Sequence, residues 1–384
     1  MTLDLSRRAL LASGLLGGAA LAWPRIAFAR TGGEKRLVFV IQRGAADALS
    51  TLGAPGDPQF AATRGVLADD FAGRPQIGGL FALHPALEKT SAMFDAGEVL
   101  FAPAIASTYR ERSHFDAQNV LETGGARPYA AKDGWLNRLL GLLEGAEARA
   151  LALAAAAPPV LRGPHSVSSY APSGLPDARA ALLERVGQLY AEDAQLDSLW
   201  NDALRTRGIA GDEAVQRRDA ASLGTLAASM LAAPDGARIA TIETTRWDTH
   251  YGQRGRMARL LRDLDVTLSA LRAGLGSAWA DTLVIVATEF GRTVSVNGTG
   301  GTDHGTGSLA WLLGGRVRGG RIVGDWPGLA PSALYQGRDL APAQGFEALV
   351  AGAVAEHYGL DPERVARTLF PEMEGRPAKA LIAA

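Results

Sequence analysis

The sequence predicts an α/β domain in which a large, mostly parallel β-sheet lies between two layers of helices. Short runs dominated by Val, Ile and Leu alternate with longer segments whose apolar residues recur every three or four positions. The first pattern is typical of strands buried on both faces, and the second is typical of helices that cover a sheet. The chain has 384 residues, of which 47% are hydrophobic, and this is enough for one large core.

Strands are expected at six apolar runs. The clearest is residues 282–287, where β-branched residues dominate and no polar residue alternates. The other runs are residues 36–41, 99–103, 238–243, 309–313 and 319–323. Gly314 and Gly315 separate the last two runs, so we expect these two to form a hairpin at an edge of the sheet.

Helices are expected between the strands. The longest one is indicated by an apolar stripe at Met257, Leu260, Leu264, Leu268, Leu271 and Leu275. Residues 182–200 and 346–358 are two further predicted helices. Residues 148–178 are rich in Ala, Pro, Ser and Gly and have little periodicity, which predicts an irregular excursion beside the sheet.

The first 29 residues have the features of an export signal. Arg7 and Arg8 precede a modest apolar stretch, and Ala27-Phe-Ala29 matches a small-x-small cleavage site. We therefore predict a twin-arginine signal peptide over residues 1–29, the twin-arginine translocase as a partner during export, and a periplasmic location. The apolar stretch is too short and glycine-rich to be a stable membrane span. The remainder, residues 30–384, is expected to be a single domain; the alternative for the leader is an uncleaved amphipathic tail.

Charge and cysteine content exclude several classes of function. The chain has a formal net charge of −1, and the leader holds Arg7, Arg8 and Arg25 against Asp4, so the rest carries −3. With no basic stripe, no nucleic-acid partner is expected. The chain has no cysteine, which excludes disulfides, cysteine nucleophiles and thiolate metal sites.

Carboxylates and histidines follow several of the predicted strands. One threonine separates Glu289 from the run 282–287, and His304 lies further on in a glycine-rich loop. Asp47 follows the first strand, and Asp248 and His250 follow the strand at 238–243. Ligand sites of open α/β sheets lie at the carboxyl ends of the strands, so these side chains are expected to meet there. Carboxylates together with imidazoles indicate a hydrolytic metal site.

These motifs together resemble the bacterial family called domain of unknown function 1501. Besides the leader, the resemblance rests on a Gly-x-x-Asp turn after the first strand and on the motifs His84–Leu87, Arg112–Phe115, Trp247–His250, Thr288–Thr293 and Gly301–Gly305. That family in turn resembles the alkaline phosphatase and sulfatase superfamily, whose members bind two divalent metals at strand ends and cleave phosphate or sulfate esters. The resemblance implies an alkaline-phosphatase-like fold, a small anionic substrate, and metal-dependent hydrolysis of a phosphate or related anionic ester.

The resemblance also implies roles for individual residues. The implied ligands of a divalent metal (zinc, manganese or iron) are Asp47, Asp248, His250, Glu289 and His304. The implied nucleophile is Ser113 or its neighbour His114, and Arg112 or Arg292 would stabilise the developing negative charge. Phe290 stands where the superfamily has a second metal-binding histidine, so at most about one tightly held ion is expected. Without cysteine, no cysteine-derived formylglycine can form, which argues against ordinary sulfatase chemistry.

Most of these residues also have a structural alternative. The alternatives are a capping box of Ser113 with Asp116, a helix cap at Asp47, a surface pair of Asp248 with His250, and a salt bridge from Glu289 to Arg292 or Arg112. His84 and His357 are predicted to be structural. Arg43, Arg112 and Arg292 each lie beside a motif and could hold an anion without metal. The alternative function is therefore a catalytically degenerate periplasmic binding or envelope-associated protein on the same fold.

Overall fold

The computed structural model describes residues 35–143, 149–171, 180–210 and 219–383. The predicted signal peptide, residues 1–29, lies outside the described residues. In the described part of the chain, no helix is both long enough and apolar enough to cross a membrane.

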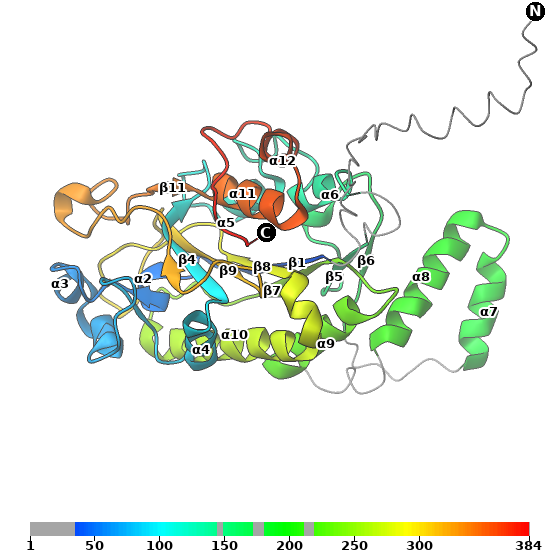
Figure 1. Ribbon diagram of the computed structural model, residues 1–384, viewed down its shortest axis with the longest axis horizontal. Helices are drawn as coiled ribbons and strands as arrows, with labels where there is room; N and C mark the ends of the chain where they lie inside the picture. Colours follow the sequence, from blue (N-terminus) through cyan, green and yellow to red (C-terminus); the bar gives the residue numbers. More distant parts are fainter. Residues whose placement is uncertain (1–34, 144–148, 172–179, 211–218, 384) are drawn as a thin grey trace, which may run out of the picture.

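A nine-stranded sheet forms the centre of the fold (Figure 1). Its strands are β1 (Arg36–Gln42), β4 (Val99–Ala106), β5 (Ala150–Ala152), β6 (Val167–Ser169), β7 (Ile239–Thr244), β8 (Thr282–Ala287), β9 (Ser308–Leu313), β10 (Arg321–Ile322) and β11 (Gln344–Gly345). Their order is β10-β4-β9-β8-β1-β7-β5-β6, and β11 pairs with β4. A separate small sheet joins β2 (Leu52–Gly53) to β3 (Ala82–Leu83). Every residue of β1, β4, β8 and β9 is buried, which explains their continuous apolar runs.

Strand direction decides which loops meet at one edge of the sheet. Every pairing within the large sheet is parallel except those of β9, which runs antiparallel to both β4 and β8. The start of β9 therefore lies at the edge where β1, β4, β7 and β8 end. This confirms the predicted mostly parallel sheet, and it brings the loop before β9 to the predicted site.

Each face of the sheet packs on its own layer of helices. α4 (Glu88–Asp95), α9 (Ala220–Ala232) and α10 (Gln253–Leu275) cover one face, and α6 (Trp135–Leu140), α11 (Phe346–Tyr358) and α12 (Pro362–Leu369) cover the other (Figure 1). Along β1 the side chains alternate: Val38 and Val40 join the first core, whereas Leu37, Phe39 and Ile41 join the second. The predicted layered fold class is confirmed.

The long helix α10 forms where the apolar stripe predicts it. It follows Gly252, which has a left-handed φ of 50°, and ends at Gly276, where φ is 53°. Five of the six stripe residues are buried, and Leu260 is partly buried. Burial of such a side chain contributes roughly 1.5–3 kcal/mol, so the stripe fixes this helix on the sheet. α9 packs closely on it because Gly224 has no Cβ that would collide with the Thr267 carbonyl oxygen.

The remaining helices are short or lie beside the sheet. The α-helices are α2 (Ala48–Thr51), α3 (Phe60–Arg64), α5 (His114–Thr123), α7 (Ala180–Tyr190) and α8 (Ala194–Ala210). The 3-10 segments are Gly65–Phe71, Pro159–Leu161, Gly276–Asp281 and Pro331–Ala333.

Three expectations about elements were wrong in detail. β10 pairs with β4 instead of forming a hairpin with β9, because β9 is already paired on both sides. The predicted helix at 182–200 is two helices, α7 and α8, and Asp193 between them accepts hydrogen bonds from the first amides of α8. Within the stretch 148–178, predicted as irregular, the described residues 149–171 contain β5 and β6, and the rest lies outside the described residues.

Candidate metal centre

The ends of four parallel strands and the start of β9 surround one cluster of polar side chains. His114 is the first residue of α5, in the connection that follows β4, and Asp248 lies four residues beyond the end of β7. His304 lies four residues before β9. Backbone pairing between Arg292 and His304 joins the loop after β8 to the loop before β9. The topology therefore brings together residues that are up to 190 positions apart in the sequence.

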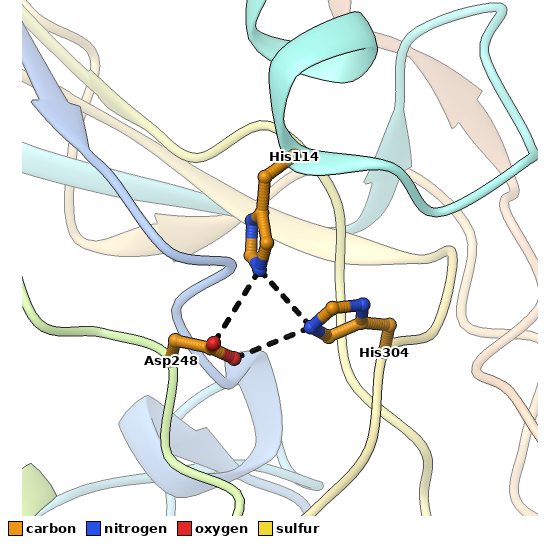
Figure 2. Close-up of side chains that lie close together, drawn as sticks. All are labelled: His114, Asp248 and His304. Carbon is orange, nitrogen blue, oxygen red and sulfur yellow. Dashed lines mark hydrogen bonds and ion pairs between the residues drawn. The ribbon is translucent and has the colours of Figure 1, made fainter.

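Three side chains in this cluster have the arrangement of metal ligands. One ligand atom from each of His114, Asp248 and His304 lies within 4.8 Å of the others (Figure 2). The Nε2 atoms of His114 and His304 are 3.0 Å apart, and Asp248 approaches them at 3.6 and 3.3 Å. His250 lies beside this group, with its Nε2 atom 3.1 Å from His304 Nε2 and 2.9 Å from Asp248 Oδ1. The predicted residues Asp248, His250 and His304 thus lie together, and His114 joins them.

The second nitrogen of each histidine is held by an acceptor. His114 Nδ1 lies 2.8 Å from Glu289 Oε1, His304 Nδ1 lies 3.1 Å from the Arg112 carbonyl oxygen, and His250 Nδ1 lies 3.1 Å from Asp303 Oδ1. A carbonyl or carboxylate oxygen can only accept, so each Nδ1 carries the proton in a neutral ring. The lone pairs of the three Nε2 atoms then point at one another and at a carboxylate. A metal ion, or a proton on one of the rings, would satisfy these lone pairs, and oxygen-bonded Nδ1 atoms are the usual outer environment of metal-binding histidines.

The spacing of the ligand atoms fits a small divalent ion. Ligands about 2.0–2.1 Å from a tetrahedral ion are roughly 3.3 Å from one another. The two imidazole Nε2 atoms are 3.0 Å apart, and the nearest carboxylate oxygens of Asp248 are Oδ1, 3.3 Å from His304, and Oδ2, 3.6 Å from His114. Two imidazole nitrogens and one carboxylate oxygen suit zinc, manganese or iron. The residues present therefore fit one ion.

Glu289 is buried and holds the ring of His114 in place through a hydrogen bond. Its Oε1 atom accepts hydrogen bonds from the Gly44 amide at 2.8 Å, from Gln118 at 3.0 Å and from His114. Burial alone would raise the pKa of Glu289, but the hydrogen bonds from His114 and Gln118 outweigh it and lower the pKa. Glu289 is thus held as a carboxylate that orients His114. Glu289, predicted as a metal ligand, is outside the described group of His114, Asp248 and His304 and binds the ring of His114 instead. The structural alternative, a salt bridge to Arg292 or Arg112, is absent from its described contacts.

The remaining pKa directions show how charge is distributed in the cluster. The hydrogen bond to Glu289 raises the pKa of His114. Burial, together with the nearby charges of His114 and Arg292, lowers the pKa of His304. For Asp248 burial would raise the pKa, but Arg292 outweighs this effect and lowers it. Asp248 is therefore an anion and His304 a neutral base, which are the forms that bind metal, whereas the raised pKa of His114 favours its protonated ring, which would have to lose its Nε2 proton to bind.

Arg292 connects the loops of the site and pairs with Asp248. Its side chain is fully buried, and its Nη2 group donates to Asp248 and to the Gly44 carbonyl. Its Nε and Nη1 groups donate to the Ala45 and Thr302 carbonyls. All three nitrogens are therefore engaged by the protein. This guanidinium fixes the carboxylate of Asp248 and the loop after β1.

Asp47, predicted as a ligand, is not part of the described cluster. Its side chain caps α2 by accepting from the Leu49 amide, as in the structural alternative. Its other oxygen forms a buried ion pair with Arg64 and accepts hydrogen bonds from Ser50 and Gln253. The guanidinium of Arg64 thus provides the positive charge next to the Asp47 carboxylate, in place of a metal ion.

Ser113 precedes α5 as predicted, but it does not form the capping box. It is the N-cap residue, and its side chain makes no capping hydrogen bond. Its backbone amide donates to Tyr109 at 3.3 Å, and Asp116 faces the same tyrosine hydroxyl. In the described part of the chain, no serine or threonine hydroxyl is hydrogen-bonded to His114, Asp248 or His304.

Arg112 contributes its carbonyl to His304, while its guanidinium forms an ion pair with buried Asp339 at 2.7 Å. Its φ of 61° is unusual for a residue with a side chain. Strained backbone of this kind persists where the surroundings fix it, commonly at functional sites.

Glycines let the loops around the cluster pack closely, and one phenylalanine packs against its histidine rings. A Cβ on Gly301 would collide with the backbone of His250, and a Cβ on Gly305 would collide with that of Arg292. The glycines therefore allow this loop to approach the two neighbouring backbone segments closely. Phe290 is buried and packs against the rings of His114 and His304, with centroid distances of 4.9 and 5.1 Å.

Two supporting residues, Gln118 and Glu122, were not predicted. Gln118 links Glu289 to Arg43, and Arg43 pairs with Glu122 at 2.8 Å. His114, Gln118 and Glu122 recur every four positions, and this spacing puts them on one face of α5. A polar stripe of this kind was therefore visible in the sequence. His84 and His357 are buried away from the cluster and bonded to backbone groups, as predicted.

Comparison with known proteins identifies the family. The family model described as "Protein of unknown function (DUF1501)" matches residues 34–369, so the chain belongs to this family. No curated protein sequence matches the chain significantly.

Similar solved structures include three proteins. The lipoteichoic acid synthase LtaP from Listeria monocytogenes matches with a TM-score of 0.38 and 10% identity, over 91% of this chain and 75% of that chain. The C-terminal periplasmic domain of EcEptC from Escherichia coli in complex with Zn matches with a TM-score of 0.36 and 8% identity, over 74% of each chain. The phosphonate monoester hydrolase SpPMH from Silicibacter pomeroyi matches with a TM-score of 0.40 and 11% identity, over 85% of this chain and 74% of that chain. At these TM-scores and identities, the likeness does not bear on the activity of this chain.

Proposed function

We propose that this member of the DUF1501 family is an exported hydrolase that uses one divalent metal ion to cleave a phosphate or related anionic ester. The observation that carries the proposal is the convergence of the His114, His250 and His304 Nε2 atoms on Asp248, with each Nδ1 atom held by an oxygen. The export part of the proposal is based on the predicted twin-arginine leader, residues 1–29.

His114, Asp248 and His304 would hold the ion. A bound divalent ion would polarise the ester and lower the pKa of a water molecule towards neutrality. A site with three protein ligands keeps a position open for substrate, as in catalytic zinc sites, whereas closed four-ligand sites are structural. Asp248 is positioned by Arg292, and His114 is positioned by Glu289.

His250, which the sequence indicated as a ligand, is assigned here the role of general base. Its side chain is 40% exposed, compared with 24% for His114 and 27% for His304, so it lies on the open side. Asp303 holds its Nδ1 atom and would stabilise the charged ring after Nε2 has accepted a proton. No protein nucleophile is included, because the described hydroxyl groups do not contact the ligand atoms.

The discriminating experiment measures metal content and hydrolysis in the same variants. Wild-type protein is expected to contain about one ion per chain, and His304→Ala is expected to lose it. His250→Ala is expected to keep the ion and lose about 100-fold or more in turnover of 4-nitrophenyl esters. His165→Ala is a matched control, because the hydrogen bonds of His165 to Asn137 use backbone atoms.

Two outcomes contradict the proposal. Wild-type protein without metal, together with identical melting of His304→Ala, would favour the binding-protein alternative. Loss of metal from His250→Ala would make His250 a fourth ligand and the site a closed structural one.

A further inference from the structure

A helical hairpin extends from one end of the central sheet (Figure 1). Its arms are α7 and α8, and α8 packs on α9 and on the outermost strand β6. Trp200 in α8 contacts Tyr190, with 5.8 Å between the ring centroids, and lies against Gly187. Leu204, further along α8, shares a cavity with Leu183, earlier in α7. The two helices therefore run antiparallel, and one row of residues on each helix holds the hairpin together.

Four leucines of this hairpin lie outside the two contact rows and are exposed. In α7, Leu182 is 55% exposed and Leu189 is 77% exposed. In α8, Leu196 is 41% exposed and Leu199 is 57% exposed. At about 100° per residue, the leucines of each helix are displaced from its contact row by about 90–150° in the same sense. On antiparallel helices, displacements in the same sense lead to the same face of the hairpin. The four side chains therefore share one apolar surface, termed here the leucine face.

Charged side chains lie at the two ends of the leucine face and have opposite signs. The turn between the helices carries Glu192 and Asp193, both exposed, and Arg207 lies near the other end of α8. A two-fold axis between two such faces, at right angles to the helices, would place the turn of each hairpin beside the Arg207 end of the other. Opposite charges would then meet at both ends, and the leucines would meet without like charges between them.

The charge of the hairpin does not suit an anionic membrane surface. Residues 180–210 contain five carboxylates, three guanidinium groups and no lysine, which gives a formal charge of −2. Helices that lie on membranes usually carry lysine and arginine on their polar face, because the lipid surface is negative. A second copy of this chain fits both the apolar face and the charges at its ends.

We propose that two copies of this chain pair through their leucine faces and form an antiparallel four-helix bundle. The face is roughly 20 Å wide and 16–25 Å long, because each helix is about 10 Å in diameter and rises 1.5 Å per residue. This is smaller than a standard interface, which buries about 800 Å² per partner, so a weak dimer is expected. A dissociation constant of about 1–100 μM would correspond to such a dimer. The pairing requires no metal and is independent of the proposed hydrolysis.

The test is analytical ultracentrifugation of the full chain over a range of concentrations. The mass of the wild type should rise from one copy towards two between about 1 and 200 μM. Leu189→Glu and Leu199→Glu should each weaken association by about tenfold or more, because the dimer would bury an unpaired charge. Both side chains are exposed in the single chain, so Tm measured in parallel at low concentration should not change. Val66→Glu is the matched control: Val66 is 58% exposed and directly follows α3 and Gly65, at the other end of the molecule (Figure 1).

A charge swap tests the antiparallel arrangement. Glu192→Arg should weaken association by about 2- to 5-fold, the usual strength of an exposed ion pair. Adding Arg207→Glu should restore it, whereas further weakening in the double variant would overturn the antiparallel pairing. A wild type that stays a single copy at all concentrations would overturn the inference, and so would a dimer that both leucine variants leave intact. Binding to vesicles of phosphatidylglycerol and phosphatidylethanolamine that Leu189→Glu abolishes would overturn it in favour of a membrane surface.

Discussion

Glu289→Gln separates metal affinity from folding, and its effect can be worked out in advance. The amide has the shape of the carboxylate, so its carbonyl can keep the hydrogen bonds from Gly44, Gln118 and His114. Its new NH2 group faces Thr288, whose hydroxyl oxygen can accept. What is lost is the negative charge behind His114, and loss of such an outer partner lowers metal affinity by about 10- to 100-fold.

The size of the effect on stability follows from mass action. At a metal concentration about 100 times the wild-type Kd, the ion stabilises the wild type by about 2.7 kcal/mol. With an affinity 10- to 100-fold lower, the same concentration stabilises the variant by only about 0.4–1.4 kcal/mol. For a chain of about 350 residues, the metal-induced rise in Tm should fall from roughly 4 °C to about 0.5–2 °C.

The assay is thermal melting of both proteins with and without added Zn²⁺, after removal of metal with a chelator. Glu347→Gln is the matched control, because Glu347 is also a buried glutamate and lies in α11, outside the centre. Burial raises the pKa of Glu347, so a neutral amide is well tolerated there. An unchanged metal-induced rise in Tm for Glu289→Gln would refute the assignment of His114 as a ligand oriented by Glu289.

The remaining predictions concern stability and export. Burial lowers the pKa of His357 from 6.5 to about 3, so the unfolded state binds more protons between these values and the free energy of unfolding should fall as pH drops below 6.5. Urea denaturation should show a loss of about 2 kcal/mol at pH 5 relative to pH 7.5, and His357→Gln should flatten this slope. Asp47→Ala should lower the free energy of unfolding by about 3–5 kcal/mol, because it leaves Arg64 buried and unpaired, and bound metal measured in parallel should not change. Lysine in place of both Arg7 and Arg8 should keep the protein in the cytoplasm, as measured by cell fractionation; a periplasmic double variant would contradict the twin-arginine leader.

The sequence predicted best those strands and helices whose residues all share one environment, such as burial on both faces or a single buried stripe. Strands β1 and β8 are buried on both faces, and their apolar runs predict them to within one residue. Helix α10 carries one buried stripe, and its spacing predicts the helix. The two-residue strand β10 has no such pattern, since its place is set by pairing with β4 and not by its own residues. Its predicted pairing was wrong for that reason.

The same distinction holds for the candidate site. Asp248, His250 and His304 were predicted together because each follows or precedes a recognisable strand, and their proximity is seen in the structure. Glu289 was predicted to bind the metal, or alternatively an arginine, because a buried carboxylate requires a cation or donors. Its partner is His114, and nothing local in the sequence relates positions 114 and 289. Only the direction of β9 and the start of α5 bring them together.

Asp47 and Asp248 show why one ion per chain is the coherent interpretation. Both follow parallel strands at the same edge, and each has an arginine against its carboxylate. Arg64 is fully buried and also donates to the Val294 carbonyl at 3.1 Å, so it cannot leave Asp47 to make room for a metal. Asp248 differs because its side chain remains 43% exposed and lies within 3.6 Å of two imidazole nitrogens that carry no proton when neutral. The chain therefore supplies the cation at Asp47, whereas at Asp248 the side chains of His114 and His304 leave a place for an ion from solution.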